Sequence, residues 1–446
     1  MSSTSMSPPR ETVAGAFDVE SLMRADLPPA AARWTGFPEF NLVGGHNDAA
    51  SVPVDGLIEA ATRVLQREGP TLSTYGLASG PLGYLPLREF IVRKLARDAG
   101  IRCTPDEVLI TSGSLQGLDL VNDVFLAPGD TVVVEDMNYA GTLSRLKRRG
   151  ANIVGVPLDS GGMRIDALDA ALADLARRGI RPKFIYTIPT VQNPTATVMS
   201  TERRAQLLEL SARYGVPIFE DECYADLTWD GVRPQALRGM PGGDRVVHIG
   251  SFSKTIAPAL RIGYLVAGWP LMGRILALKT DGGTGALEQM VLAEYCATHF
   301  DSHVKALRAT LRRKVEILMA AIRDSFGAAA TFADPTGGIF LWMALPQPVD
   351  TTRLAQVALQ AGVAINPGAE WMTDGDAGRS WLRVCFAHPD EPTMRNGLAR
   401  LAEVCRREFD VPAAVGGVHA GGGSRTPLPP PSVGEGRDGG CVRNSP

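Results

Sequence analysis

The amino-acid sequence predicts an α/β protein with a large domain built on a doubly wound, mostly parallel sheet, followed by a smaller α+β domain. Three observations predict this class. Short apolar runs of strand length alternate with longer amphipathic stretches through the middle of the 446-residue chain. The runs show little polar–apolar alternation, which is typical of strands buried on both faces. After about residue 301 a long helical stretch precedes weaker strand signals, which favours a second domain.

The expected elements of the large domain follow one another as strands and helices in turn. Strands are predicted at 107–111, 131–135, 153–156, 184–187, 217–220 and 246–249. Helices are predicted at 116–125, 141–149, 165–178 and 201–214. Apolar runs at 338–342 and 381–386 predict strands of the second domain. In open sheets of this kind ligands bind beyond the carboxyl ends of the strands, so we expect the functional side chains there.

The composition changes near both ends of the chain. Residues 1–15 are small and polar, and residues 413–446 are rich in glycine and proline. Because neither stretch offers enough apolar surface to offset the entropy lost on ordering, both are expected to be disordered. Between them we expect an N-terminal segment that joins the small domain at 16–69, a large domain at 70–300 and a small domain at 301–412.

Charge and cysteine usage narrow the range of partners. A formal net charge of −3 provides no basic field for nucleic acid, so a small-molecule partner is expected. No run approaches the roughly 18 apolar residues of a membrane span, and the N-terminus lacks the apolar stretch of a signal peptide. The six cysteines are scattered, which argues against a metal site or a disulfide framework and favours the cytoplasm.

A lysine with neighbouring hydroxyls is the first candidate for chemistry. In Ser251-Phe252-Ser253-Lys254 the lysine follows a predicted strand, and Arg261 comes seven residues later. A desolvated lysine can form an imine with an aldehyde cofactor, and two hydroxyls with an arginine suit a phosphate dianion. The same tetrapeptide is also compatible with a solvated turn.

Two other strand ends carry polar groups. Asp221 stands at the tip of an apolar strand, where its carboxylate could pair with a protonated pyridine nitrogen, and Tyr224 follows three residues later. The alternative is a solvated acidic turn. Ser114 begins a helix after the strand at 107–111, and the free N–H groups there suit a phosphate. The alternative is an ordinary helix cap.

Asn193 and Tyr139 complete the set of candidates. Asn193 precedes a proline, which holds it extended and lets it present its amide. Tyr139 offers a flat ring that could stack on a pyridine. Each feature alone has unremarkable explanations, but their occurrence together is difficult to assign to chance.

From about residue 40 to residue 401 the chain resembles the class I aminotransferases of fold type I, nearest the branch of aminoadipate and kynurenine aminotransferases. The motifs that carry the resemblance occur in the order of the family. They are Tyr75-Gly76, Gly83-Tyr84-Leu85-Pro86-Leu87-Arg88, Ser112-Gly113-Ser114, Tyr139, Asn193-Pro194, Asp221 with Tyr224, Ser251-x-Ser253-Lys254, Arg261, Pro335-x-Gly337-Gly338 and Arg383.

The resemblance implies pyridoxal 5′-phosphate (PLP) as cofactor, held as an imine on Lys254, which would also move the proton between the substrate Cα and the cofactor. Asp221 would pair with the pyridine nitrogen. The remaining cofactor contacts implied are Asn193 and Tyr224 at the phenolic oxygen, Tyr139 stacked on the ring, and Ser114, the Leu115 backbone, Ser251, Ser253 and Arg261 at the phosphate.

The resemblance also implies how the substrate and a second subunit would be bound. Arg383 would hold the α-carboxylate of an amino substrate through two parallel hydrogen bonds, and Asn193 would contribute to the same site. Tyr75 in this family usually reaches the phosphate of the neighbouring subunit. A homodimer with shared active sites is therefore expected.

Two stretches depart from the family pattern. Gly44-Gly45-His46 occupies the place of a usual Gly-Gly-x-Pro that lines the substrate pocket, so Gly45 is expected there. His46 is either a loop histidine or a second acid/base beside Lys254. The run Gly282–Gly285 replaces a segment usually rich in hydroxyls, which would enlarge or loosen the pocket.

Transamination of an amino acid or amino-bearing metabolite is the function expected first, in a biosynthetic setting. The same cofactor site also serves elimination, replacement, cyclisation or oxidation, and the altered pocket keeps these alternatives open. A non-catalytic PLP-binding sensor is a remote alternative, because the roughly 40 residues before the resemblance are too few and too polar for a DNA-binding module. A generic α/β binding protein is the last alternative.

Overall fold

The computed structural model describes residues 18–412, except residues 26, 29 and 32. These residues fall into two compact units, which divide between Phe37 and Pro38. The first unit contains the 3-10 turn Glu20–Leu22, and Trp34 and Phe37 pack edge to face with ring centroids 5.0 Å apart. The stretch 413–446 and residues 1–15, both predicted to be disordered, lie outside the described residues.

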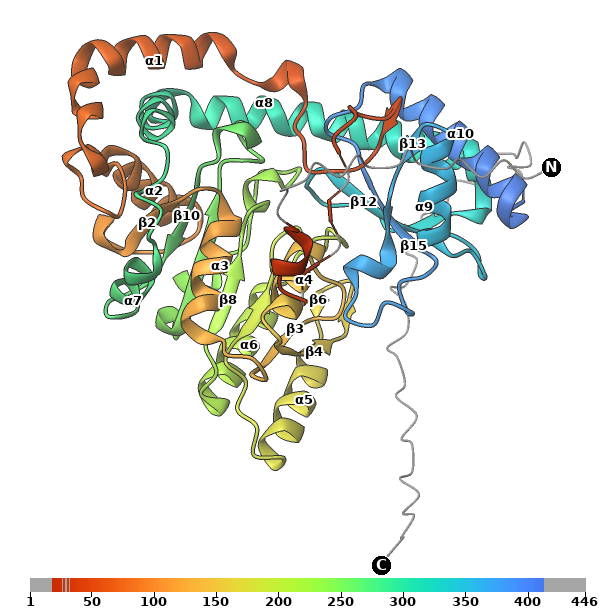
Figure 1. Cartoon of the computed structure of the whole chain (residues 1–446), viewed down its shortest axis with the longest axis horizontal. Helices are drawn as coiled ribbons and strands as arrows, with labels where there is room; N and C mark the ends of the chain where they lie inside the picture. The colour runs from red at the N-terminus through yellow and green to blue at the C-terminus, as the bar shows by residue number, and fades with distance from the viewer. Residues whose placement is uncertain (1–17, 26, 29, 32, 413–446) are drawn as a thin grey trace, which may run out of the picture. The chain divides into compact units, whose positions relative to one another are not determined.

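A seven-stranded sheet forms the centre of the second unit (Figure 1). In spatial order its strands are β2 (Val108–Thr111), β10 (Gly263–Val266), β9 (Val246–Ser251), β8 (Ile218–Asp221), β7 (Ile185–Thr187), β3 (Thr131–Glu135) and β4 (Asn152–Val156). All neighbours pair in parallel except β10, which is antiparallel to β2 and β9. Every strand except the edge strand β4 is fully buried, which explains why the sequence runs do not alternate.

Four helices connect strands of this sheet: α3 (Ser114–Phe125), α4 (Ala140–Arg148), α5 (Ile165–Arg177) and α6 (Thr201–Tyr214). A fifth, α7 (Leu271–Leu278), follows the last strand of the sheet along the chain and packs on α3. Helix α6 begins after Ser200, whose side chain accepts a hydrogen bond from the Arg203 N–H, and ends at Gly215 in the left-handed conformation. The predicted class, a doubly wound, mostly parallel α/β sheet, is confirmed.

Three further helices pack beside the sheet: α1 (Val54–Glu68), α2 (Leu85–Asp98) and the 41-residue α8 (Ala286–Phe326). Helix α8 contacts α1 and α2, and it also contacts α10 (Glu391–Phe409), so it connects the large sheet to the C-terminal part of the chain (Figure 1). Because α8 continues past residue 300, the domain division expected there remains a prediction. Among the described helices, none is both long and apolar enough to cross a membrane.

A four-stranded antiparallel sheet with two helices forms the C-terminal layer. Its strand order is β11 (Thr331–Phe332), β12 (Phe340–Ala344), β15 (Trp381–Cys385) and β14 (Asn366–Pro367). Helix α9 (Thr351–Gln360) contacts β14, and α10 packs on α9 and α8. Near the start of the second unit, β1 (Phe40–Asn41) pairs in parallel with β13 (Val363–Ala364). This pairing supports our proposal that the N-terminal segment joins the small domain.

Candidate active site

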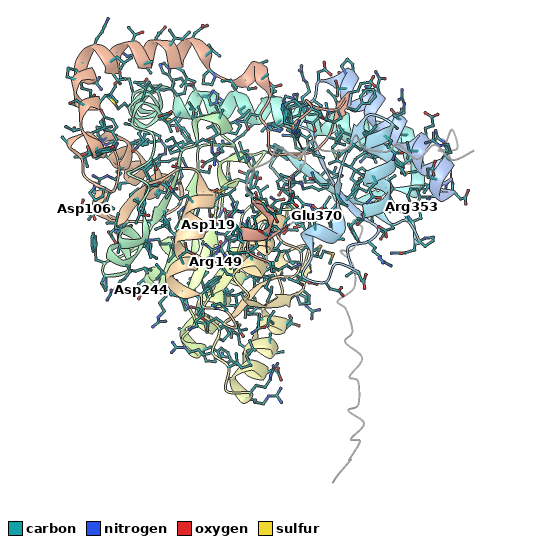
Figure 2. The ribbon with its side chains drawn as sticks, viewed as in Figure 1. Asp106, Asp119, Arg149, Asp244, Arg353 and Glu370 are labelled. Carbon is teal, nitrogen blue, oxygen red and sulfur yellow. The ribbon has the colours of Figure 1, made fainter. Side chains whose placement is uncertain are left out.

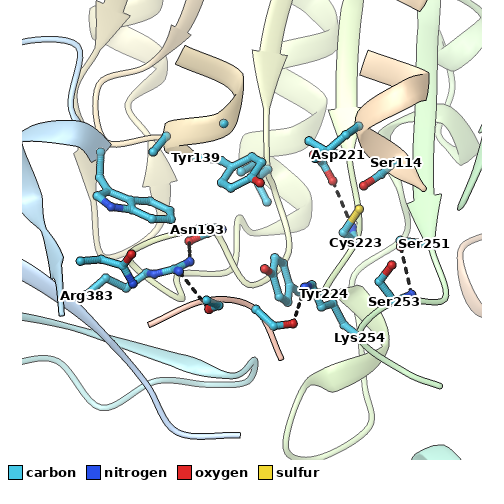
Figure 3. A pocket seen from close by; sticks show the side chains of 18 of the residues that line it. Ser114, Tyr139, Asn193, Asp221, Cys223, Tyr224, Ser251, Ser253, Lys254 and Arg383 are labelled. Carbon is cyan, nitrogen blue, oxygen red and sulfur yellow. Dashed lines mark hydrogen bonds between the residues drawn. The ribbon is translucent and has the colours of Figure 1, made fainter. Parts of the chain in front are cut away.

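The carboxyl ends of β2, β8 and β9 lie beside one cavity of 380 Å³. Asp221 ends β8, Ser251 ends β9, and Ser114 begins α3 directly after β2; all three line the cavity (Figure 3). The three strands run in one direction, so their carboxyl ends share one edge of the sheet. The buried strands therefore position these side chains.

All of the site residues predicted from the sequence line this cavity except His46 and Tyr75. They are Gly45, Ser114, Leu115, Tyr139, Asn193, Asp221, Tyr224, Ser251, Ser253, Lys254, Arg261 and Arg383.

The amine of Lys254 points to the loop that contains Gly45. Its Nζ donates a hydrogen bond of 2.7 Å to the carbonyl oxygen of Gly45. Burial lowers the pKa of Lys254, and the positive charges of Arg383 and Arg261 lower it further. A lysine with a lowered pKa releases its proton more readily, which is what imine chemistry requires.

Hydroxyl and guanidinium donors gather at one end of the cavity. Ser114, Ser251, Ser253 and Arg261 line it there, close to the N-terminus of α3. Arg261 donates to the carbonyl oxygens of Ser112 at 3.2 Å and Pro258 at 3.0 Å. A side chain at position 113 would overlap the Arg261 guanidinium, so the glycine there allows the close approach. This donor set suits a phosphate dianion.

Asp221 accepts two hydrogen bonds on its two oxygens. The buried Tyr186 hydroxyl donates to Oδ2 at 2.7 Å, and the Cys223 N–H donates to Oδ1 at 3.2 Å. Burial raises the pKa of Tyr186 well above its ordinary value, with the charge of Asp221 adding to the effect, so the hydroxyl keeps its proton. Both carboxyl oxygens of Asp221 therefore accept hydrogen bonds from donors of the same chain. Sequence reasoning missed Tyr186, which comes from the neighbouring strand β7.

Aromatic rings and an amide form the walls near Asp221. The Tyr139 ring lies 5.9 Å from the Trp371 ring between centroids, and Tyr224 packs edge to face on Phe340 at 5.1 Å. The Asn193 Oδ1 accepts a hydrogen bond of 3.1 Å from Arg383, which leaves the amide N–H₂ to donate to another group.

Arg383 projects from β15 and is only 4% exposed. Besides the bond to Asn193, it donates from Nη2 to the Gly44 carbonyl oxygen at 3.1 Å, and its guanidinium lies 3.8 Å from the centroid of the Trp371 ring. Its Nε is buried and makes no hydrogen bond with any described residue. A buried guanidinium with a free donor is suited to bind a carboxylate.

His46 and Tyr75 lie outside the cavity lining. The centroids of the His46 and His388 rings are 5.5 Å apart, and the His46 ring packs against Gly44. Burial lowers the pKa of His46, and the charges of His388 and Lys254 lower it further. Tyr75 is 93% exposed and lines a separate hollow of 850 Å³ together with Gly282 and Gly283.

Sequence reasoning also missed residues from the C-terminal layer. Asn366, Glu370 and Trp371 line the cavity. The Cys385 thiol donates a hydrogen bond of 2.7 Å to the Gly44 carbonyl oxygen. Asn366 stands directly opposite Arg383 in the β14–β15 ladder. No sequence signal marked these positions, because β14 spans two residues, too few for a periodic pattern. Among the described residues, no group of three histidine, cysteine or acidic residues is arranged to hold a metal ion.

Comparisons with known proteins agree with this geometry. Residues 41–401 match the family "Aminotransferase class I and II". The aromatic-amino-acid aminotransferase 1 of Thermococcus litoralis is 31% identical and is matched over 83% of this chain and 88% of its own. The 2-aminoadipate transaminase of Thermus thermophilus is 32% identical, over 82% of this chain and 90% of its own.

A solved structure of an aminotransferase is also similar to this chain. The multiple substrate aminotransferase of Thermococcus profundus superposes with a TM-score of 0.81 at 29% identity, covering 88% of this chain and all of that one. Curated relatives also include transcriptional regulators of the helix-turn-helix type, such as YisV of Bacillus subtilis, 30% identical over 77% of this chain and 70% of its own. The chain belongs to the class I and II aminotransferases, a family of PLP-dependent enzymes with the fold type I architecture.

Proposed function

We propose that the protein is an aminotransferase that takes the amino group from an amino acid or amino-bearing metabolite and passes it to a keto acid, with PLP held on Lys254. One observation carries the proposal. The amine of Lys254, the carboxylate of Asp221 and the guanidinium of Arg383 line one cavity, although they come from separate parts of the chain.

The residues present fit PLP at each of its polar groups. Ser114, Ser251, Ser253, Arg261 and the Leu115 backbone would hold the phosphate at the N-terminus of α3. Asp221, whose two oxygens accept hydrogen bonds from Tyr186 and the Cys223 N–H, would pair with the pyridine nitrogen. The contacts proposed for the rest of the ring are Asn193 and Tyr224 at the phenolic oxygen and Tyr139 on one face.

The chain's own groups would bind the substrate and move its proton. When bound, PLP supplies an electron sink that stabilises negative charge at the substrate Cα. The Arg383 guanidinium would bind the α-carboxylate with Nε, its unpartnered donor. The Lys254 Nζ, whose pKa is lowered by burial, would take the proton from Cα and return it. The Gly45 carbonyl would orient that amine between these steps.

Absorbance spectroscopy tests the proposal. Protein loaded with PLP should show the visible band of the lysine-bound cofactor, lose it with an amino donor and regain it with a keto acid. Lys254→Ala should lack the band, whereas Lys147→Ala, which removes an exposed lysine on α4, should keep it. A wild-type protein without the band, or an amino donor that yields ammonia and no keto acid, would contradict transamination.

A second candidate function is PLP chemistry other than transamination, with His46 as an additional acid/base. The charge of Lys254 contributes to the lowered pKa of His46, after burial and the charge of His388, so the two residues are near enough to interact. On this hypothesis His46→Ala keeps the visible band and loses turnover, and the products are ammonia, a cyclised compound or peroxide. His299→Ala, at an exposed position on α8, is the control. Full turnover in His46→Ala would remove the candidate.

We further propose a homodimer with shared active sites. Tyr75 is 93% exposed and lies outside the cavity of its own chain, beside Gly282. Large apolar side chains are exposed near it in sequence, among them Val54 and Ile58 on α1 and Leu72. Exposed apolar surface of this kind supports an interface.

Subunit complementation tests the shared site. Lys254→Ala and Tyr75→Ala each remove a residue proposed for every active site, so each homodimer should be inactive. In a mixed dimer one site would combine the intact Lys254 of one chain with the intact Tyr75 of the other. Recovery of activity on mixing is the expected result, and light scattering should give twice the chain mass. If Tyr75 served its own chain, the mixed dimer would have no intact site.

The location and setting of the reaction are also proposals. The described cysteines are all free thiols, which supports a reducing compartment such as the cytoplasm. We propose a biosynthetic role there. Fractionation of the source cells tests the location, since recovery outside the cytoplasmic fraction would contradict it.

A further inference from the structure

Two carboxylates line the cavity, and they differ in their surroundings. Asp221 accepts hydrogen bonds from Tyr186 and from the Cys223 backbone. Glu370, on the 3-10 turn Gly368–Trp371 (labelled in Figure 2), makes no hydrogen bond or ion pair with any described residue. Asp221 thus has hydrogen-bond donors within the described chain, whereas Glu370 has none.

None of the positively charged side chains that line the cavity forms an ion pair with Glu370. Lys254 is bonded to the Gly45 carbonyl, Arg261 to the carbonyls of Ser112 and Pro258, and Arg383 to Asn193 and Gly44. Burial alone shifts the pKa of the Glu370 carboxyl, and it shifts it upward. The Glu370 side chain nevertheless stays exposed, so its carboxylate remains solvated and is open to pair with a cation brought by a ligand.

The position of Glu370 relates it to the substrate rather than to the cofactor. The next residue, Trp371, places its ring 3.8 Å from the Arg383 guanidinium, which is the proposed α-carboxylate site. The phosphate donors Ser114, Ser253 and Arg261 come from the segments that follow β2 and β9 of the large sheet, whereas Glu370 comes from the turn after β14 in the C-terminal layer. A substrate held by Arg383 is therefore bordered by the turn that carries Glu370.

We propose that Glu370 selects amino substrates whose side chain ends in a cation, an amine or a guanidinium, through a charge-assisted hydrogen bond at the cavity wall. This inference rests on the proposed aminotransferase function and names its substrate class. The same carboxylate disfavours side chains that end in a carboxylate, because two like charges would be placed together.

Single-turnover spectroscopy of the PLP-loaded protein tests the inference without knowledge of the keto acid. The probes are L-lysine, L-arginine and L-norleucine, of which norleucine has the chain length of lysine without the terminal amine. The observable is the rate of loss of the visible band divided by the half-saturating concentration. For wild type we expect this ratio to be at least tenfold higher for lysine or arginine than for norleucine. High salt should narrow the difference if an exposed charge is responsible.

Two substitutions assign the preference to the carboxylate. Glu370→Gln keeps the shape and removes the charge, so the preference for the cationic probe should fall at least tenfold. Glu370→Lys should raise the ratio of L-2-aminoadipate to norleucine above that of wild type. Glu209→Gln, at an exposed position on α6, should leave every ratio unchanged.

The outcomes separate this inference from the proposed function. If norleucine reacts as well as lysine and arginine in wild type, or if Glu370→Gln retains the full preference, Glu370 does not select the substrate and the inference is overturned. In both cases transamination still stands, because the band responds to amino acids. If neither an amino acid nor another amino-bearing metabolite alters the band, the proposed function fails and the substrate class with it.

Discussion

The Lys254 Nζ and the Gly45 carbonyl oxygen are joined by a hydrogen bond of 2.7 Å across 209 positions of sequence. The preceding carbonyl, that of Gly44, accepts from Arg383 at 3.1 Å. Two adjacent peptide oxygens thus contact the amine proposed for catalysis and the guanidinium proposed for substrate binding. The loop that contains Gly44 and Gly45 therefore holds two side chains in place: Lys254, which follows β9 of the large sheet, and Arg383, which lies on β15 of the small sheet.

Replacement of Gly45 by alanine should weaken cofactor loading more than it weakens the fold. The added Cβ would overlap the Lys254 Nζ, and because that atom ends a flexible side chain, the lysine is expected to move aside at little cost in stability. We expect a clearly reduced visible band at saturating PLP and a melting temperature within a few degrees of wild type.

Gly268→Ala is the matched control, since its nearest neighbour is the Glu107 Oε1 at 3.9 Å, an ordinary contact. A Gly45→Ala protein that binds PLP as wild type does would show that the contact with Gly45 does not position the lysine.

Replacement of Tyr186 by phenylalanine should weaken the hydrogen bonding that holds the Asp221 side chain in place. The variant loses a buried donor to Oδ2 at 2.7 Å, and hydrogen bonds to charged groups contribute about 1.5–3 kcal/mol. An Asp221 side chain held by one donor fewer is less well placed to pair with a pyridine nitrogen, so PLP affinity should fall roughly tenfold or more. Fluorescence titration of the cofactor-free protein with PLP measures this.

Tyr214→Phe provides the comparison. Its hydroxyl donates to Asp169 at the same distance of 2.7 Å but far from the cavity lining, so PLP affinity should not change. Equal affinities in the Tyr186 and Tyr214 variants would mean that Tyr186 serves only the packing of β7.

Replacement of Arg383 by lysine should reduce kcat/KM by about a hundredfold or more, mainly through KM. Lysine cannot reproduce the planar fork that contacts Asn193, Gly44 and the Trp371 ring at once. Steady-state kinetics with a good amino donor measure the loss. Arg213→Lys, on the exposed surface of α6, should behave as wild type, and an Arg383→Lys enzyme with an unaltered KM would place the α-carboxylate elsewhere.

The sequence predicted the large sheet because its signals are local. The strand at 131–135 and the helix at 201–214 coincide with β3 and α6. In both, the order of apolar and polar residues within the segment is enough to predict which residues are buried. Lys254, Asp221 and Ser114 were found for the same reason, since each stands where a strand ends. Their roles rest on the resemblance, and those roles remain predictions.

The rest of the site depends on contacts between distant segments. Tyr186 reaches Asp221 through the register of β7 and β8, which pairs Tyr186 with Phe219 and which no single segment encodes. Glu370 and Trp371 follow β14, a strand of two residues. The N-terminal Gly45 is brought to Lys254 by tertiary packing alone. A periodic pattern cannot predict such pairs.

Glu135 should make stability depend on pH in a defined window. The residue is fully buried at the end of β3, and burial raises the pKa of its carboxyl to about 7 from an ordinary 4.5, although Thr187, Gln192 and the Ile188 N–H donate to it. Because the folded pKa is the higher one, the native state binds more protons than the unfolded state between pH 4.5 and 7.

Stability should therefore fall as the pH rises through that window, and the full penalty applies above pH 7. A shift of this size corresponds to at most about 3 kcal/mol. Glu135→Gln removes the titration, so the unfolding free energy of wild type minus that of the variant should decrease from pH 4.5 to pH 7, measured by urea unfolding at several pH values. Glu209→Gln, an exposed substitution, should give a constant difference. A constant difference for Glu135→Gln as well would show that the buried carboxyl titrates at its ordinary pKa, held ionised by its three donors.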